Sequence, residues 1–408
     1  MGGVTLHKIW LNEGVMNNFN KWALTGVAFM SYMIMSGMIT QIGVLVSSLA
    51  EYLSISVTDA AVTFSYLSGG TLVGTFVSMA AYSRFCISKV MRINYFVFVS
   101  VIVSLVVFDY RNIQFISCSL FILGACCGVG LAGGSVVLSK LYDGGKRTSA
   151  FIATDCAFSA SGFIFPTLAS LLIAANVSWV YGYGSVSILA IIILLLTFIL
   201  AFPKDDELSG SKNTSFFKQI PKMNNRVYLM GAALCMYLIA QNSFLTWSPH
   251  YLQEVFKLDP VSARSAVGNY WGPSIIGLII SAFVVQKVSP RGMLLFISFM
   301  SVVITSVLVS LEDPNQFLTV TLALGFVTTC MYKIAISIGT QQMKDAPALL
   351  VTFLLCCGTV GSTIAPALSA KFVEYFGVKS AMIMTMGSYL TTFVLLIIIL
   401  YLEKVEVE

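Results

Sequence analysis

Apolar stretches separated by short polar segments run along almost the whole chain. An α-helix needs about 20 apolar residues to cross the hydrocarbon core of a bilayer, so each stretch predicts one membrane-spanning helix. The pattern predicts twelve such helices, at residues 22–49, 61–82, 93–108, 114–138, 149–174, 177–202, 227–253, 262–285, 292–310, 316–342, 348–372 and 379–402. The longest polar stretch, 203–226, is too short for a core of its own and predicts a flexible linker.

Composition and charge agree with this pattern. The chain is 57% hydrophobic and 10% charged, whereas an ordinary soluble domain has about 25% charged residues. Alternate polar segments, including both termini, hold 17 Lys and Arg, and the opposite set holds five. Positive loops stay in the cytoplasm, so both termini are expected there, in a multi-pass protein of the bacterial inner membrane. The net charge of +5 follows from this asymmetry and does not indicate nucleic-acid binding.

The chain repeats itself at about half its length. A shift of about 200 residues aligns small residues and prolines of corresponding helices, which is the kind of internal repeat that transporter folds carry. The matches are Gly74 with Gly277, Gly124 with Gly325, and Pro166 with Pro366, at offsets of 203, 201 and 200. The repeat predicts an all-α membrane protein with a six-helix bundle at 1–202, a cytoplasmic linker at 203–226 and a second six-helix bundle at 227–408. Gly124 and its neighbours are expected at close helix contacts.

Two charges lie deep inside the predicted helices: Asp155 among the acids and Lys333 among the bases. A charge at bilayer depth is costly unless it faces a partner, a packed interior or water. At about 1.5 Å per residue, Asp155 lies about 12 Å from the cytoplasmic end of its helix and Lys333 about 16 Å from the same face. We predict that they form a gate or proton-coupling pair between the two bundles. A static ion pair, or separate polar neighbours for each charge, is the alternative.

Other polar side chains at membrane depth are candidates for a substrate cavity. In the tenth predicted helix, Thr329, Lys333 and Ser337 share one face, and a polar face buried in lipid must look at protein or water. Amides both donate and accept hydrogen bonds, which suits recognition of a neutral polar solute. The candidate set for the cavity is Gln41, Gln241, Asn242, Trp247, Asn269, Thr329 and Ser337. Trp247 is as well explained by anchoring near the outer interface, and the hydroxyls by bonds between helices.

Three stretches together resemble a known family. They are 244–251 (FLTWSPHY), 324–342 (from LGF to SIGTQQ), and Asp155 followed by GFIFP at 162–166. With them, the whole chain resembles the major facilitator superfamily, in particular TsgA-like proteins near the fucose-permease branch. The resemblance implies a carrier of a small solute that works by alternating access. One departure is the loop at 82–92, which keeps basic residues but lacks the family's usual glycine and acid, so an acid-dependent latch is not expected there.

The leading hypothesis is a secondary transporter that imports a small polar solute, a sugar or a related metabolite, with a proton. An efflux antiporter and a non-transporting sensor on a carrier fold are the alternatives. The nine cysteines have no disulfide or zinc spacing, and no nucleotide-binding motif or nucleophile–base arrangement is found. We therefore expect no cofactor, no metal and no enzymatic activity. The expected partners are the solute, a proton and the lipid bilayer, and the expected state is a monomer.

Overall fold

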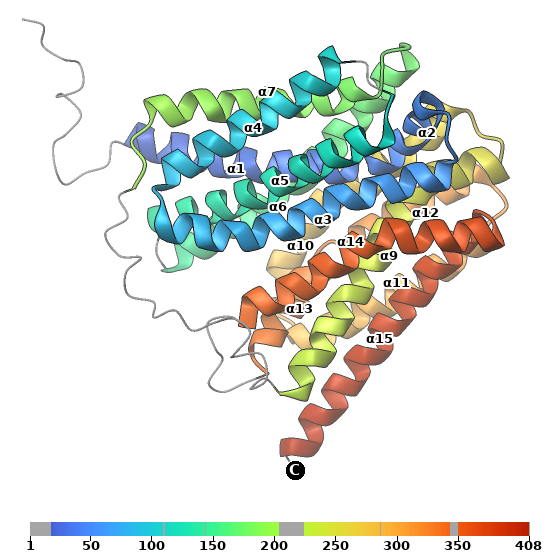
Figure 1. Ribbon diagram of the computed structural model, residues 1–408. Helices are drawn as coiled ribbons and strands as arrows, with labels where there is room; N and C mark the ends of the chain where they lie inside the picture. The colour runs from blue at the N-terminus through green and yellow to red at the C-terminus, as the bar shows by residue number, and fades with distance from the viewer. Residues whose placement is uncertain are drawn as a thin grey trace, which may run out of the picture.

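The structure is a computed structural model that describes residues 18–108, 111–142, 144–203, 224–285, 287–342 and 350–407. These residues form helices joined by short connections, with no strand among them (Figure 1). The helices are α1 (Asn18–Thr40), α2 (Ile42–Leu53), α3 (Val57–Arg84), α4 (Ile87–Val107), α5 (Ile113–Leu141), α6 (Gly144–Ala174), α7 (Val180–Ile199), α9 (Asn225–Val255), α10 (Pro260–Val284), α11 (Pro290–Ser310), α12 (Pro314–Thr328), α13 (Met331–Thr340), α14 (Leu350–Phe376) and α15 (Lys379–Val407).

Each of the twelve predicted helices corresponds to one helix or to a broken pair of helices. Eleven spans among the described residues are long and apolar enough to cross a membrane. They do not include α10, although its 25 residues are long enough to span. The chain is thus a multi-pass membrane protein.

Two predicted helices are broken, which the hydrophobic pattern did not indicate. The first divides at Gln41 into α1 and α2, and the tenth divides at Thr329 and Cys330 into α12 and α13. Beside each break a side chain bonds back to the carbonyl oxygen of the preceding turn: the Gln41 amide to Gly37 at 2.7 Å and the Thr329 hydroxyl to Gly325 at 2.5 Å. Such back-bonding competes with the helix ladder and bends helices.

The helices pack in two groups, α1–α7 and α9–α15, and corresponding pairs touch in each. The α3–α5 contact matches α10–α12, and α4–α7 matches α11–α15. A Cβ at Gly124 would overlap the carbonyl oxygen of Leu67 in α3, and one at Gly325 would overlap that of Tyr270 in α10. The expectation of close helix contact at Gly124 is therefore confirmed. We call the two groups the N-terminal and C-terminal bundles; their limits at the linker stay a prediction, because 204–223 lie outside the described residues.

An arginine at the start of a helix holds the last turn of another in both bundles. In α4, Arg92 donates to the Thr197 carbonyl oxygen of α7 at 2.7 Å. In α11, Arg291 Nε donates to the Glu403 carboxylate of α15, also at 2.7 Å. The positions of the two arginines differ by about 200 residues, so this tie also follows the internal repeat.

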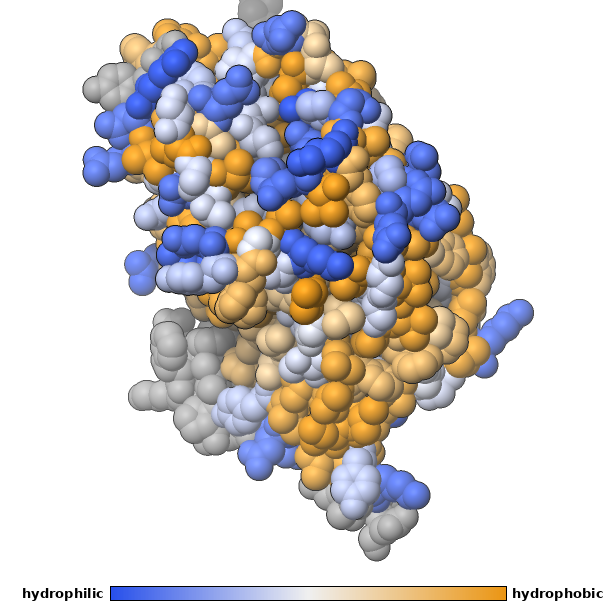
Figure 2. Space-filling model, turned by 90° about the vertical axis from the view of Figure 1, so that its right-hand side faces the viewer, coloured by the Kyte–Doolittle hydropathy of each residue, from blue (hydrophilic) through white to orange (hydrophobic). Residues whose placement is uncertain are grey.

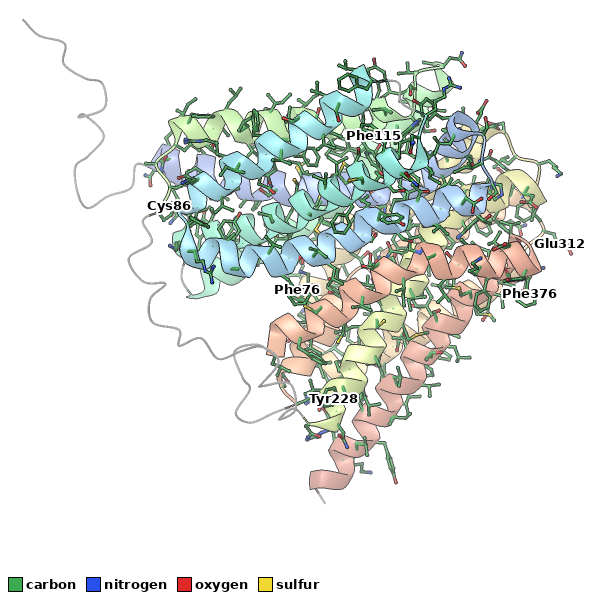
Figure 3. The ribbon with its side chains drawn as sticks, in the orientation of Figure 1. Phe76, Cys86, Phe115, Tyr228, Glu312 and Phe376 are labelled. Atoms are coloured by element: carbon green, nitrogen blue, oxygen red, sulfur yellow. The ribbon has the colours of Figure 1, made fainter. Side chains whose placement is uncertain are left out.

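The two bundles converge at one end and separate at the other (Figure 1). We call the end where α7 stops and α9 begins the linker end, and the opposite end the loop end. Cys86 and Tyr228 lie toward the linker end, whereas Glu312 and Phe376 lie at the loop end (Figure 3). Figure 2 faces the loop end and shows hydrophilic residues gathered over it, with apolar residues covering the lower part of the view. In the predicted orientation, the linker end is cytoplasmic.

Close packing joins the bundles in the half of the molecule nearer the loop end. α3 packs against α14, α6 against α10, and α2 against α9. A Cβ built at Gly43 of α2 would overlap the carbonyl oxygen of Leu245 in α9. One at Gly69 of α3 would lie 3.5 Å from the Thr363 methyl group of α14, which is ordinary contact. We call this set of contacts the loop-side seam.

α10, which forms part of this seam, begins at a well-defined cap. The Asp259 carboxylate accepts a hydrogen bond of 2.9 Å from the Ser262 backbone N–H, and Pro260 follows at the first helical position. Hydrogen bonds to the carboxylate favour its charged form, so they hold the pKa of Asp259 below its ordinary value.

Candidate functional site

The structure brings Asp155 and Lys333 together. Lys333 Nζ of α13 lies 3.1 Å from Asp155 Oδ1 of α6, so this ion pair joins the two bundles. The Asp155 side chain is 19% exposed and the Lys333 side chain 52% exposed. The other ion pairs among the described residues lie within one bundle. Along α6, Asp155 precedes Gly162 and Thr167, which contact α10, so the pair lies on the linker side of the loop-side seam.

Packing inside the C-terminal bundle directs Lys333 toward this position. Its neighbour Tyr332 stacks on Tyr237 of α9, with ring centroids 6.1 Å apart and planes at 24°. Successive residues of a helix point about 100° apart. With Tyr332 fixed against α9, Lys333 and Ser337 lie on a different face of α13, where both are exposed. This is the polar face that the spacing of four residues predicts.

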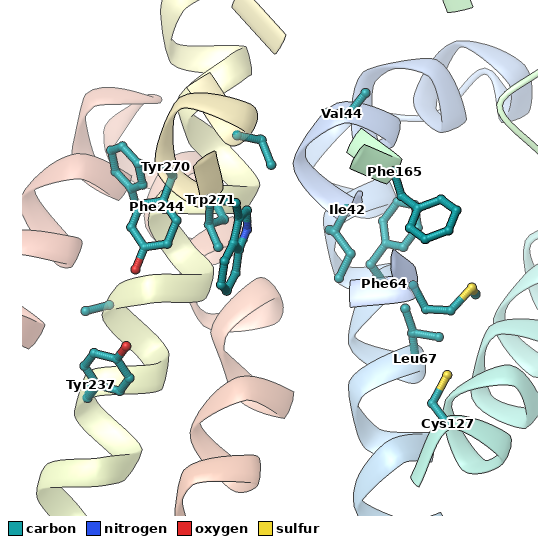
Figure 4. Close-up of a cluster of buried hydrophobic side chains, with 14 of the residues drawn as sticks. Ile42, Val44, Phe64, Leu67, Cys127, Phe165, Tyr237, Phe244, Tyr270 and Trp271 are labelled. Atoms are coloured by element: carbon teal, nitrogen blue, oxygen red, sulfur yellow. The ribbon is translucent and has the colours of Figure 1, made fainter. Parts of the chain in front are cut away.

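Trp271 of α10 lies next to the ion pair along α6. Its ring is 5.7 Å from the ring of Phe158, one turn beyond Asp155, and it touches the backbone at Gly162. The Trp271 side chain is buried, and its indole N–H has no hydrogen-bond partner among the described residues. In Figure 4, Trp271 lies on the side of the C-terminal aromatic cluster that faces the N-terminal bundle. From the sequence, Trp271 is only a weaker candidate beside Asn269, since a tryptophan in a membrane helix has many roles.

Gln241, a predicted cavity residue, belongs to a buried network inside the C-terminal bundle. Its amide nitrogen donates to the hydroxyl groups of Tyr270 at 2.8 Å and Tyr237 at 3.3 Å. The Tyr270 hydroxyl also bonds the Thr328 hydroxyl at 2.6 Å, and the Tyr237 hydroxyl donates to the Thr328 carbonyl oxygen. This network ties α9, α10 and α12 to one another. In this conformation the amide of Gln241 is engaged by its own bundle.

Two further predicted cavity residues are fully buried. Trp247 donates from its indole nitrogen to the Ser369 hydroxyl of α14 at 2.8 Å. Gln41 lies at the break between α1 and α2, and its side-chain oxygen has no partner among the described residues. A Cβ at Gly182 would lie 2.8 Å from that oxygen, so α7 packs directly over it. Both side chains lie inside their own bundles.

The remaining predicted cavity residues are more accessible. Asn242, Asn269 and Thr329 are half-buried, whereas Ser337 is exposed. The Asn242 amide donates to the Leu238 carbonyl oxygen at 2.8 Å and that of Asn269 to Leu318 at 3.3 Å. Their side-chain oxygens have no hydrogen bond described here, which leaves an acceptor at each position. The described residues include no group of three His, Cys, Asp or Glu placed to hold a metal ion.

Comparisons with known proteins identify the family of this chain. The model of the Major Facilitator Superfamily matches residues 24–348, so the chain belongs to that superfamily of transporters. Among its relatives are the protein TsgA homologs of Yersinia enterocolitica and Yersinia pseudotuberculosis. Each is 29% identical over 392 residues, covering 95% of this chain and 98% of the relative. This chain is a TsgA-like member of the superfamily.

Two solved structures show the same fold. A D-xylose-proton symporter superposes with a TM-score of 0.73 at 13% sequence identity. The superposition covers 91% of this chain and 97% of the symporter chain. A variant of the nucleoside transporter NupG gives a TM-score of 0.71 at 12% sequence identity, over 93% of this chain and 99% of the NupG chain. The predicted all-α major facilitator fold is therefore confirmed.

Proposed function

We propose that this protein is a secondary transporter that imports a small polar solute with a proton by alternating access, and that Asp155 and Lys333 couple the two. The ion pair between the bundles carries the proposal. Rocking of the bundles must change the surroundings of a pair that joins them, whereas pairs within one bundle move as a unit. The likeness in fold to a sugar symporter and a nucleoside transporter supports the choice of a polar solute.

The chemistry of the pair suits proton coupling. Protonation neutralises the Asp155 carboxylate and removes most of its attraction for the Lys333 ammonium, which frees the bundles to move. Loss of the proton restores the charge and the attraction. Lys333 and Ser337 of α13, with Asn242 of α9, are the proposed solute contacts, because they are accessible where the bundles separate. In the predicted orientation, the helices of the two bundles separate toward the cytoplasm (Figure 1), and we propose that solute and proton leave on that side.

Transport into proteoliposomes tests the proposal. A panel of sugars, nucleosides and related metabolites is offered with and without an inward proton gradient. We expect the gradient to drive accumulation of at least one solute by the wild-type protein. Asp155→Asn should abolish that accumulation but preserve exchange of labelled for unlabelled solute, because exchange needs no net proton movement.

The matched control is Glu374→Gln. Glu374 pairs with Lys371 at 2.9 Å within α14, so this variant also removes one acid from an ion pair, but not one between bundles. It should accumulate solute like the wild-type protein. Unchanged gradient-driven accumulation by Asp155→Asn would show that Asp155 is not the coupling acid.

A further inference from the structure

The interface between the bundles carries buried hydrogen-bond donors without an acceptor in the part of the chain that the structure describes. Arg264 and Trp271 of α10 are seven residues apart, so they share one face of the helix. Arg264 is 9% exposed and Trp271 7% exposed, and the Nε–H of Arg264 and the Nε1–H of Trp271 have no partner among the described residues. Between them on this face, Gly268 packs against Thr167 and Phe163 of α6. The donors therefore belong to the interface with the N-terminal bundle.

Lys333 adds a third donor nearer the linker end. An ammonium group has three N–H bonds, and the contact described for Lys333 is the one to Asp155 at 3.1 Å. Its half-exposed side chain leaves room for another acceptor. Two acids act on these donors: Asp155 faces Lys333, and the charge of Glu51 in α2 acts on Arg264. Buried donors without acceptors are costly, so they mark places where an incoming group with acceptors binds well.

Charge balance then limits the solute that can use this pair. Asp155 and Lys333 together are neutral. When a proton neutralises Asp155, Lys333 is left as an unpaired cation at membrane depth, which is unfavourable. A neutral solute leaves the charge of Lys333 unpaired, whereas a solute with one negative charge replaces Asp155 as the partner of Lys333. The site is thus neutral both before binding and after it has bound one proton and one anion together.

We infer that the transported solute carries one negative charge, on a carboxylate or on a phosphate in its singly charged form, which takes the place of protonated Asp155 on Lys333. The Trp271 N–H donates to the same solute, and Arg264 attracts it when the loop end opens. No bond to a heavy atom forms or breaks; the proton moves onto Asp155 and the anion exchanges with the carboxylate. The inference rests on the proposed function, because it uses proton binding at Asp155, and it narrows the class of solute.

Ligand-induced stabilisation of the purified full-length protein in detergent tests the inference. Matched solutes are D-glucuronate with D-glucose, D-gluconate with D-sorbitol, and D-glucose 6-phosphate with D-glucose, which separates carboxylate from phosphate. We expect at least one anion to raise the melting temperature in a saturable manner while its neutral counterpart does not. The Asp155→Asn variant should bind that anion about tenfold more tightly than the wild-type protein does, which is a usual size for the coupling between two sites. Its affinity for the anion should not depend on pH.

Variants locate the binding group. Lys333→Gln should abolish the stabilisation by the anion, whereas Lys371→Gln, which removes an exposed lysine from α14, should leave it unchanged. Trp271→Phe keeps the ring but loses the N–H, so it should weaken the affinity several-fold. If Lys333→Gln alone does not fold, Asp155→Asn with Lys333→Gln removes both charges and should fold without binding the anion.

Three outcomes would overturn the inference: no anion stabilises the protein, a neutral solute stabilises it as well as its anion, or the effect survives the loss of Lys333. Uptake measurements separate this failure from failure of the proposed function. Accumulation of a neutral solute with protons would overturn the inference and leave the transporter proposal intact. An anion that binds at Lys333 but is never accumulated would overturn the transporter proposal and leave only an anion-binding site at Lys333.

Discussion

The two halves of the interface between the bundles are held by different forces. Toward the loop end, small residues let backbones touch, as at Gly43 against Leu245. Toward the linker end, the ion pair of Asp155 and Lys333 joins α6 of one bundle to α13 of the other. The first contact depends on shape and is indifferent to pH, whereas the second depends on the charge of one carboxylate. Only the second can respond to a proton.

This difference indicates how a transporter can be both stable and movable. Helices in lipid gain little from the hydrophobic effect between themselves, so their association depends on close packing and polar contacts. A closely packed seam holds one conformation firmly but gives no means of release. An ion pair is a weaker contact that a single proton can weaken, so placing it beside the seam couples release to protonation. The predictions below test this contrast from the largest expected effect to the smallest.

Gly43→Ala should have the largest effect. A Cβ there overlaps a backbone oxygen of α9, which cannot turn aside like a side chain, so α2 and α9 must separate. We expect a loss of about 1–3 kcal/mol of stability, the usual cost of overpacking, and loss of transport. Chemical denaturation of the purified protein and uptake into proteoliposomes measure the two effects.

Two other glycines calibrate that result. Gly69→Ala would place its methyl group in ordinary contact with Thr363, and Gly26→Ala would place it in open space. Both variants should retain the wild-type stability within about 0.5 kcal/mol, as is usual for substitutions that disturb nothing. Equal losses for all three glycines would mean that close packing at the seam is not what makes Gly43 sensitive.

The ion pair should show a smaller, non-additive effect. Asp155→Asn and Lys333→Ala each leave one charge without its partner, whereas the double variant leaves neither. We expect the double variant to be more stable than the sum of the single losses implies, by about 1 kcal/mol, because residues in contact couple. Because the Lys333 side chain is half-exposed, the coupling free energy between the two substitutions should lie toward the low end of the range for ion pairs. Strict additivity in denaturation experiments would argue that the contact contributes nothing.

The cap of α10 at the loop end should give the smallest effect, and one that depends on pH. The pKa of Asp259 is lower in the folded protein than its ordinary value, so its stabilising contribution is present at neutral pH and is lost as the pH falls through the lowered pKa. The difference in melting temperature between wild type and Asp259→Ala should therefore narrow below about pH 4. Asp259→Asn keeps a capping oxygen that does not titrate; if it showed the same narrowing, the carboxylate would not be responsible.

Much of the architecture was determined by the sequence alone. Helices that cross lipid must satisfy their own backbone and must be apolar over about 20 residues, so twelve spans were visible without tertiary information. The cost of a charge in lipid singled out Asp155 and Lys333, and counting residues from the charged ends put them at similar depth. The repeat at about 200 residues pointed to corresponding packing in the two halves, which the contacts at Gly124 and Gly325 display.

Tertiary structure alone decided which polar side chains meet one another. Gln41, Gln241 and Trp247 have the chemistry of ligand-binding residues, yet in this conformation helix packing turns them into the bundles. In the sequence Trp271 was only a weaker candidate, because the burial of its N–H without a partner among the described residues arises only when α10 packs against α6. Hydrophobic pattern fixes how deep a residue lies in the membrane; the rotation of its helix, set by neighbours far away in the chain, fixes what it faces.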